Sequence, residues 1–170
     1  MSDWAQFSHC SYCGHRFAVG QPWPRQCTHC HNVTYRNPLP VSIVLLPVED
    51  GLLAVRRDID PGRGKLALPG GFIELPESWQ EAGARELREE TGLAIDARGL
   101  SSFRVYSAPD GTLLIFGLAS PWSGSLPPFN GAEESSERLI IRHTVPMAFS
   151  LHTRVVREYF QMQGAEAPVQ

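Results

Sequence analysis

The sequence predicts a domain of the α+β or layered α/β class, preceded by a small cysteine-rich segment. Two observations lead to this expectation. Stretches with the pattern of β-strands surround two stretches with the pattern of helices. All four cysteines lie before residue 36, in a segment with few aliphatic residues. Since 170 residues suit one ordinary domain with a small appendage, we expect the appendage at 1–36, the main domain at 37–163 and a flexible tail at 164–170.

Composition narrows the classes of partner. Apolar residues make up 42% of the chain, which supports a buried core, and the formal net charge is −3. Without a basic excess, no field draws the protein to nucleic acid or to an anionic membrane, so we expect neither as a main partner. The first residues lack a signal-peptide pattern, and the longest apolar run, 41–48, is too short to span a bilayer. We expect residence in the cytoplasm.

The main domain should begin with a hairpin. Two apolar runs, 41–48 and 52–57, are separated by Glu-Asp-Gly at 49–51, and Asp-Gly between such runs is a strong hairpin signal. The stretch 61–72 that follows is rich in glycine and proline, which predicts a loop around a short strand.

The stretch 78–91 predicts a helix whose two ends are marked by sequence. Ser78 and Glu81 fit a capping box, and Gly92 can adopt the left-handed conformation that ends a helix. One arc of this helix is small and mostly apolar, which suits close packing against a sheet. The residues of that arc are Gly83, Ala84, Leu87 and Thr91.

Two more strands and a second helix complete the expected domain. The strands are predicted at 103–108 and 112–119, with a Pro-Asp-Gly turn between them. The segment 121–137 predicts a loop that is acidic near its end, and 150–163 predicts the second helix.

The four cysteines form two Cys-x-x-Cys pairs, "CSYC" and "CTHC". Four thiolates at this spacing can enclose Zn²⁺ tetrahedrally, and a closed set of four cysteines is structural rather than catalytic. Disulfides or a redox pair are the alternatives, but the doubled pairs and the lack of a secretory signal favour zinc. Because the segment has little apolar material, the metal should supply much of its folding free energy. The predicted zinc ligands are Cys10, Cys13, Cys27 and Cys30.

Three glutamates, Glu86, Glu89 and Glu90, share one face of the predicted helix. Like charges at these spacings repel by roughly 0.2–0.5 kcal/mol per pair, so we expect a cation to offset the repulsion. Clusters of carboxylate oxygens suit Mg²⁺ or Mn²⁺. A solvated acidic face is the alternative that the three glutamates alone leave open.

The residues around these glutamates favour the metal interpretation. The stretch "GFIELPESWQEAGARELREETGL" (71–93) resembles a Nudix box, with every fixed position filled. This resemblance implies an α/β/α sandwich with a mixed sheet, built around a loop–helix–loop. It also implies hydrolysis of a nucleoside diphosphate that is linked to another group, which would be the small-molecule partner.

The same resemblance implies roles for individual residues. Arg85 and Glu77 match positions that orient the carboxylates and hold the loop together. The implied ligands of Mg²⁺ or Mn²⁺ are the backbone carbonyl of Gly70 and the side chains of Glu86, Glu89 and Glu90.

Nudix enzymes draw their general base either from the box helix or from a later loop. On the helix the candidates are Glu86 and Glu89. The later stretch "GAEESSERL" (131–139) offers further glutamates, of which Glu134 and Glu137 lead because "ESSE" resembles an acidic pattern that follows the box in many relatives. A solvated acidic turn is the alternative.

Beyond the box, the cysteine-rich segment followed by "YRNP" and an apolar strand resembles a zinc-ribbon Nudix group that acts on ADP-ribose, FAD and NADH. NADH pyrophosphatases of this group carry a Ser-Gln-Pro-Trp-Pro-Phe-Pro signature where this chain has "SAPDGT", with Asp110 in place of the tryptophan. ADP-ribose, or a broader dinucleotide preference that includes FAD, is therefore the first choice. The alternatives are a catalytically inactive nucleotide-sensing regulator and an RNA-cap-directed enzyme. The group also suggests a homodimer.

Adenine and phosphate contacts have several candidates. Adenine is generally held by stacking, and arginines can meet phosphate or ribose oxygens. The aromatic candidates are Phe72, Tyr106, Trp122 and Phe129, and the arginine candidates are Arg56, Arg57 and Arg63.

Overall fold

The computed structural model describes residues 6–164, which divide into two compact units with the division after Pro38. In the described part of the chain, no helix has both the length and the apolar character needed to cross a membrane. The predicted tail falls almost wholly on residues 165–170, outside the described residues.

The first unit contains a short two-stranded sheet, and a tight turn follows Cys10 and Cys27, where the N–H groups of Gly14 and His31 donate to their carbonyls. Strands β1 (Arg25–Gln26) and β2 (Val33–Thr34) pair antiparallel. Its buried apolar side chains are only Cys10, Phe17 and Cys27 among the residues that the structure describes. The apolar core of this unit is small, as its composition predicted.

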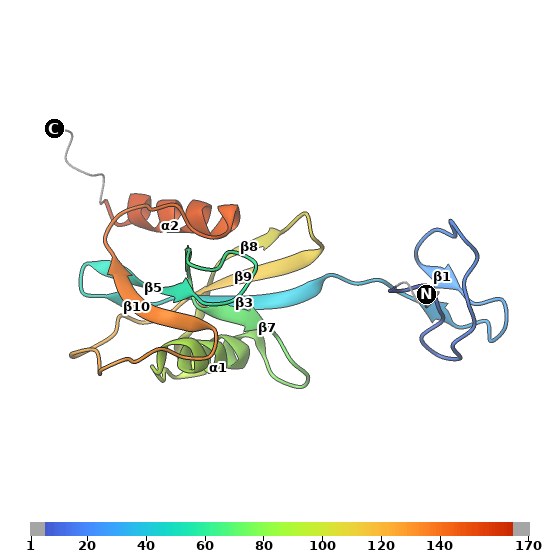
Figure 1. The fold of residues 1–170 in the computed structure, drawn as a ribbon, viewed down its shortest axis with the longest axis horizontal. Helices are drawn as coiled ribbons and strands as arrows, with labels where there is room; N and C mark the ends of the chain where they lie inside the picture. Colours follow the sequence, from blue (N-terminus) through green and yellow to red (C-terminus); the bar gives the residue numbers. More distant parts are fainter. Residues whose placement is uncertain (1–5, 165–170) are drawn as a thin grey trace. The chain divides into compact units, whose positions relative to one another are not determined.

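The second unit contains two four-stranded sheets (Figure 1). The first has the order β7-β3-β9-β8, where β3 and β9 are parallel and the other pairs are antiparallel, so this sheet is mixed. Its strands are β3 (Leu39–Leu45), β7 (Gly70–Phe72), β8 (Ser101–Ser107) and β9 (Thr112–Leu118). In the second sheet β5 pairs with all three other strands. These strands are β4 (Pro47–Val48), β5 (Gly51–Arg57), β6 (Leu66–Ala67) and β10 (Ser135–Ile141).

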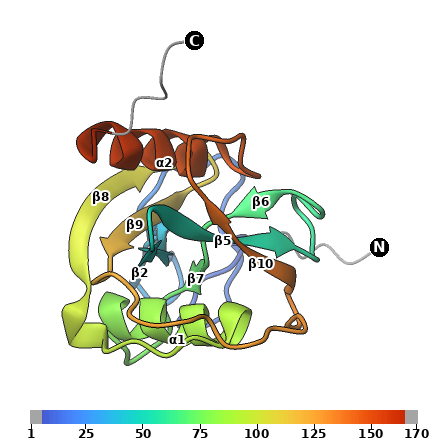
Figure 2. The same ribbon diagram turned by 90° about the vertical axis from the view of Figure 1, so that its left-hand side faces the viewer.

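Two α-helices cover opposite sides of the strands, as Figure 2 shows. They are α1 (Trp79–Thr91) and α2 (Ser150–Met162), and a short 3₁₀ helix, η1 (Ala97–Gly99), follows α1. The predicted α/β/α sandwich with a mixed sheet is confirmed.

Strand β3 explains how both layers are held. Ile43 belongs to the apolar cluster that contains Val155 and Phe160 of α2. Its neighbour Val44 belongs to the cluster that contains Leu87 of α1. Because successive side chains of a strand point to opposite faces, an unbroken apolar run such as β3 supplies both cores at once.

Helix α1 begins and ends where its sequence predicted. The Ser78 side chain accepts from the Glu81 N–H, while the Glu81 carboxylate accepts from the Ser78 N–H at 2.7 Å. Gly92 takes a left-handed conformation with φ of 73° and donates to the carbonyl of Arg88. The capping box and the glycine end therefore satisfy backbone groups that the helix itself leaves unpaired.

Close packing of α1 on β3 depends on Gly83. A Cβ atom at this position would lie 2.8 Å from Ser42 Oγ, and that hydroxyl donates to the carbonyl of Trp79 at 2.7 Å. Leu87 and Thr91 are buried on the same arc, as predicted, whereas Ala84 is only half-buried.

The predicted loop at 121–137 needs a correction, because β10 begins inside it at Ser135 and runs to Ile141. The first residues of β10, Ser-Ser-Glu-Arg, lack the apolar alternation by which a strand is recognised in sequence. They extend because they pair with the far end of β5, and such tertiary pairing overrides local preference. Glu137 therefore lies on a strand rather than on the loop where it was expected.

Candidate active site

A cavity of about 710 Å³ lies within the second unit and reaches from the α1 layer to the α2 layer. At the α1 side it is lined by Gly70, Gly71, Glu86 and Glu134. At the α2 side it is lined by Phe149–His152, the first turn of α2. Apolar side chains form part of the wall between, among them Ile43 and Leu114 of the first sheet and Leu68, which follows β6. One side of the cavity is therefore acidic and the other is largely apolar.

Two carboxylates at the acidic side are withdrawn from water. Glu90 is 5% exposed, and burial raises its pKa to about 7, with the negative charges of Glu86 and Glu134 adding to the effect. Burial also raises the pKa of Glu86, although Arg85 opposes the shift. Buried carboxylates so close to one another favour any cation that can replace the bound proton. Glu89 differs, because half of its side chain is exposed.

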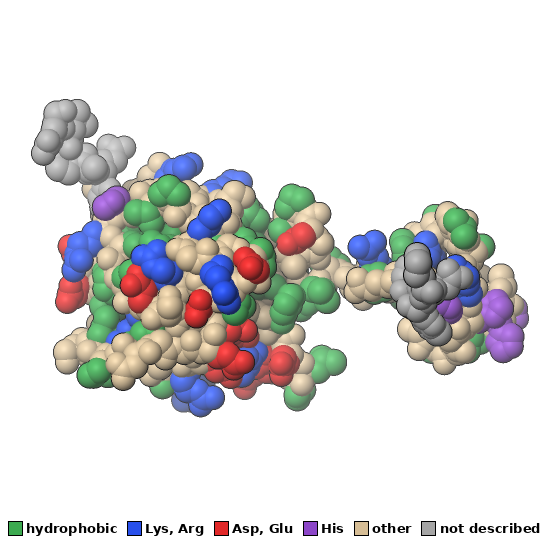
Figure 3. All heavy atoms as spheres, in the orientation of Figure 1, with side chains coloured by type: hydrophobic (Ala, Val, Ile, Leu, Met, Phe, Trp, Pro, Cys, Tyr) green, Lys and Arg blue, Asp and Glu red, His purple; other side chains and the backbone are tan. Residues whose placement is uncertain are grey.

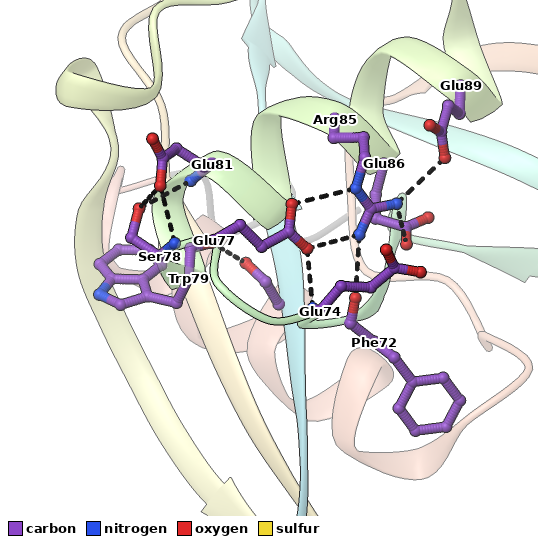
Figure 4. A network of polar contacts seen from close by, with 10 residues as sticks. Phe72, Glu74, Glu77, Ser78, Trp79, Glu81, Arg85, Glu86 and Glu89 are labelled. Atoms are coloured by element: carbon purple, nitrogen blue, oxygen red, sulfur yellow. Dashed lines mark hydrogen bonds and ion pairs between the residues drawn. The ribbon is translucent and has the colours of Figure 1, made fainter.

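Arg85 hydrogen-bonds to carboxylates of α1 and to the loop before the helix (Figure 4). Its guanidinium donates twice to Glu77, at 2.7 and 3.1 Å, and once to the Phe72 carbonyl at 3.0 Å. It also donates to Glu86 at 2.8 Å and to Glu89 at 3.1 Å. These contacts raise the pKa of Arg85 and lower that of Glu77. Arg85 therefore joins the loop before α1 to two carboxylates of the helix.

The two glycines before this loop allow a close approach of backbone and carboxylate. A Cβ atom at Gly70 would lie 2.3 Å from the Ser42 carbonyl, and one at Gly71 would lie 2.3 Å from Glu86 Oε1. The Gly70 N–H donates to Glu90 Oε2 at 3.0 Å. Any side chain at either position would displace the strand or the carboxylate.

The structure separates the two glutamates expected on the later loop. Glu134 lines the cavity, and its charge contributes to the raised pKa values of Glu86 and Glu90. Glu137 instead lies 2.6 Å from Arg56 in an ion pair on the second sheet, and it is not among the residues that line the cavity. Of these two acidic side chains, the fold therefore brings only Glu134 to the carboxylates of α1.

The candidates for ligand contacts separate in the same way. Arg57 lines the cavity, its Nε donates to the Pro61 carbonyl at 2.9 Å, and its guanidinium lies 5.2 Å from the centre of the Phe149 ring. Arg56 is engaged by Glu137, and Arg63 lies 3.7 Å from Asp58. Of the four aromatic candidates, Phe72 alone is among the lining residues of this cavity.

Carboxylates are ligands that Mg²⁺ and Mn²⁺ prefer, and the acidic side of the cavity supplies them. Among the described residues, however, the carboxylate oxygens of Glu86, Glu89 and Glu90 do not come together in one compact group. Glu86 and Glu89 are turned toward Arg85, and Glu90 accepts from Gly70. In Figure 3 acidic side chains also gather on the surface over α1 and the loop before it.

The four cysteines of the first unit form a compact group. Their sulfur atoms all lie within 4.8 Å of one another, with Cys10 and Cys30 3.7 Å apart and Cys13 and Cys27 3.6 Å apart. Four sulfurs at about 2.3 Å from a tetrahedral Zn²⁺ would be separated by about 3.8 Å, so the group fits this ion. The ring of His15 stacks on that of His29 at 5.5 Å, and no histidine belongs to the group.

Comparison with known families decides what kind of domain this is. A model of the NUDIX domain matches residues 36–153. The chain belongs to the Nudix family. As in other pyrophosphohydrolases of this family, its general activity is hydrolysis of a diphosphate linkage, and divalent metal ions serve that chemistry.

Two curated relatives resemble the chain closely enough to compare. An ADP-ribose pyrophosphatase of Methanocaldococcus jannaschii is 30% identical over 135 residues, which cover 76% of this chain and 78% of the relative. The NAD-capped RNA hydrolase NudC of Edwardsiella ictaluri is 31% identical over 118 residues, which cover 69% of this chain. The match covers only 45% of that NudC, so this chain corresponds to less than half of the relative's length.

Solved structures agree on the fold. A Nudix hydrolase from Nitrosomonas europaea is similar with a TM-score of 0.74 and 26% identity, covering 95% of both chains. A bifunctional NMN adenylyltransferase/ADP ribose pyrophosphatase from Francisella tularensis, complexed with AMP and a manganese ion, gives a TM-score of 0.56 at 27% identity. That match covers 76% of this chain and 41% of the other.

Sequence reasoning found the box residues because their spacing is fixed within one helix and its loop. It left Arg57 as one of three arginines, and it missed Phe149 and His152 entirely. Both missed residues lie where a loop meets an ordinary amphipathic helix. Their sequence carries no motif, and only the three-dimensional fold places them opposite α1.

Proposed function

We propose that the protein hydrolyses the diphosphate linkage of ADP-ribose or of a dinucleotide such as FAD or NADH, giving AMP and a second phosphate product. The observation that carries this proposal is the cavity itself. Buried carboxylates with raised pKa values stand at one side of it, an arginine lies along its wall, and apolar surface continues beyond. A metal-bound diphosphate with an organic group on each side suits such an arrangement.

Each part of the site has a separate task in the proposed reaction. Glu86, Glu89 and Glu90, with the carbonyl of Gly70, hold Mg²⁺ or Mn²⁺. Ions at this place supply neutralisation of the diphosphate charge and activation of the attacking water. Arg85 positions the carboxylates through its contacts with Glu86 and Glu89. In this scheme Arg57 binds a phosphate oxygen with the Nη groups that its bond to Pro61 leaves unused.

Glu134 is the proposed general base, in preference to Glu137 and to the glutamates of α1. It faces the cavity from the loop before β10, beside the carboxylates of α1, where it can take a proton from water on the substrate side. Glu137 is held by Arg56, and Glu86 is held by Arg85. Glu134 has no such side-chain partner in the part of the chain that the structure describes.

The substrate preference rests on the turn that replaces the NADH-pyrophosphatase signature. Asp110 lines the cavity, and its carboxylate accepts from both the N–H and the hydroxyl of Thr112, at 3.0 and 2.7 Å. A compact polar turn therefore occupies the position of a large aromatic ring. This difference supports ADP-ribose or FAD over NADH as the preferred substrate.

A substrate panel tests the proposal. The protein is incubated with ADP-ribose, FAD and NADH in the presence of Mg²⁺ or Mn²⁺, and the products are identified by chromatography. We expect AMP from ADP-ribose, and we expect Glu89→Gln to remove most of the turnover without unfolding the protein. Glu49→Gln, at an exposed turn, is the matched control and should keep full activity. Turnover of none of the three compounds would refute the substrate assignment.

Two rival functions are separated by the same panel with one added substrate. The NudC relative makes NAD-capped RNA a specific second candidate. Preference for NAD-capped RNA over ADP-ribose, with binding that weakens steeply as salt rises, would favour that candidate. Tight binding of ADP-ribose without any product would indicate a nucleotide-sensing regulator instead.

We also propose that Cys10, Cys13, Cys27 and Cys30 hold a structural Zn²⁺, so that 1–36 is a zinc ribbon and 37–163 the hydrolase domain. The distances between the four sulfurs support the first part of this proposal.

A further inference from the structure

His152 stands in the first turn of α2, on the side of the cavity opposite the carboxylates. The residue is only 6% exposed. Its ring contacts two aromatic rings, with centroid separations of 5.5 Å to Phe116 and 5.1 Å to Phe149. The imidazole is therefore held in a fixed place within a mostly apolar wall.

The backbone fixes which ring nitrogen carries the proton. The N–H of Leu68, just after β6, donates to His152 Nδ1 at 3.2 Å. Nδ1 is thus an acceptor, and in the neutral ring the hydrogen must be on Nε2. Burial, with a smaller effect from the charge of Arg57, lowers the pKa of His152 to about 3, so the ring is neutral under physiological conditions.

The Nε2–H group has no protein partner. Within residues 6–164 no hydrogen bond to Nε2 is formed. In this part of the chain, Trp122 Nε1 is the one side-chain nitrogen or oxygen that is both fully buried and without a hydrogen-bond partner. Nε2 is therefore not fully buried, and since His152 lines the cavity, this nitrogen is accessible from it. A polar donor in an apolar wall is costly unless something in the cavity accepts its hydrogen.

Arg57 marks the part of the cavity that suits the charged groups of a ligand. It lines the cavity with its guanidinium 5.2 Å from the centre of the Phe149 ring at the α2 side, and its charge also acts on Glu90 at the acidic side. A phosphate near the carboxylates would pair with this cation. What extends past it toward α2 is the organic part of the substrate, and a neutral N–H suits a neutral acceptor there.

We propose that His152 is a specificity-determining residue whose Nε2–H donates to a neutral acceptor atom on the organic group linked to the diphosphate. The acceptor is a sugar hydroxyl oxygen or an unprotonated ring nitrogen of a base. The inference rests on the proposed diphosphate hydrolysis and adds to it a donor that selects for an acceptor at the far side of the cavity.

The experiment compares wild type with His152→Phe and His152→Gln on ADP-ribose. Phenylalanine keeps a ring of similar size but has no donor, whereas glutamine can accept from Leu68 and still donate into the cavity. We expect His152→Phe to raise KM roughly tenfold with kcat within about twofold, and His152→Gln to recover much of the loss. His143→Phe, at an exposed position away from the cavity, is the matched control and should change neither constant.

Three further measurements complete the test. The melting temperature shows that each variant is folded. A ¹⁵N NMR spectrum of the wild-type histidines should show the proton of His152 on Nε2 between pH 5 and 8, with a shift when ADP-ribose is added with Ca²⁺ in place of Mg²⁺. The β-methyl ester of ADP locates the acceptor: the effect of His152→Phe disappears if the acceptor is on the terminal sugar and persists if it is on adenosine.

An unchanged KM for ADP-ribose in folded His152→Phe would overturn the inference, as would a proton located on Nδ1. Either result leaves the proposed function intact if wild type still releases AMP. Absence of turnover and of ADP-ribose binding in wild type would instead refute the proposed function.

Discussion

The backbone N–H of Gly70 donates to Glu90 Oε2 across 3.0 Å, and this bond joins strand β7 to the buried face of α1. A glutamate in such a place is an unusual choice for stability alone, because a carboxylate that is 5% exposed loses most of its hydration. Its presence is explained if a cation shares the site during function.

The first prediction concerns stability and pH. Burial raises the pKa of Glu90 from 4.5 to about 7, so the folded protein retains a proton that the unfolded chain releases near its ordinary pKa. The stability due to this proton is full below about pH 4 and is lost as pH rises to about 7, by up to about 3 kcal/mol. Urea unfolding in buffer free of Mg²⁺ and Mn²⁺ should show this decline.

Glu90→Gln provides the control for that measurement, because an amide has no proton to lose. Its unfolding free energy should decline less over the same pH range, and parallel profiles for the two proteins would contradict the assignment. Saturating Mn²⁺ should stabilise wild type more at pH 8 than at pH 5, since protons compete with the ion for the carboxylates.

The second prediction concerns Arg85. Replacing it by alanine leaves Glu77 and Glu86, both mostly buried, without their cation, so we expect a loss of about 1.5–3 kcal/mol in unfolding free energy. Activity should fall further than stability alone explains, because the carboxylates lose their orientation. Arg88→Ala, on the exposed side of the same helix, should change the unfolding free energy by less than about 0.5 kcal/mol. Equal losses in the two variants would rule out the positioning role.

The third prediction separates the acidic residues around 133–137. If Glu134 is the base, Glu134→Gln should lower kcat about 10²- to 10⁴-fold with little change in stability. Glu133→Gln and Glu137→Gln should retain kcat within a few-fold, since neither side chain lines the cavity. Initial rates at saturating ADP-ribose make the comparison. A larger loss in Glu137→Gln than in Glu134→Gln would move the base to β10.

The fourth prediction concerns the four cysteines. Elemental analysis should find one zinc ion per chain, and Cys27→Ser should remove it together with the hydrogen-exchange protection of residues 6–38. The second unit has its own core, so its amide protection should persist in the variant. His15→Ala should keep the zinc, because that residue lies outside the sulfur group. Full zinc content in Cys27→Ser would show that the ion is bound elsewhere.

The ends of α1 could be predicted from residues close together in the sequence. Strand β10 could not, because it forms by pairing with the distant strand β5. The caps of α1 depend on residues three or four positions apart, so the printed sequence contains all the information they need. The extension of Ser135 and Glu137 depends on β5, which lies far earlier in the chain. For the same reason Glu134 and Glu137 were equivalent in sequence and proved different in space.

The site followed the same division. The spacing within one helix identifies Glu86, Glu89 and Glu90. The same motif identifies Arg85. His152 becomes noticeable only when the backbone of Leu68 meets its ring and leaves one nitrogen unused. No periodicity or motif records a contact between residues so far apart.

The hydroxyl of Ser135 donates to the backbone carbonyl of Glu90, and the carbonyl of Glu134 accepts from the N–H of Asp58 at 2.8 Å. Two hydrogen bonds, one at Glu134 and one at Ser135, fix the backbone where the long connection from β9 reaches β10. Insertions or deletions upstream in that connection can therefore change its length without moving the backbone at Glu134.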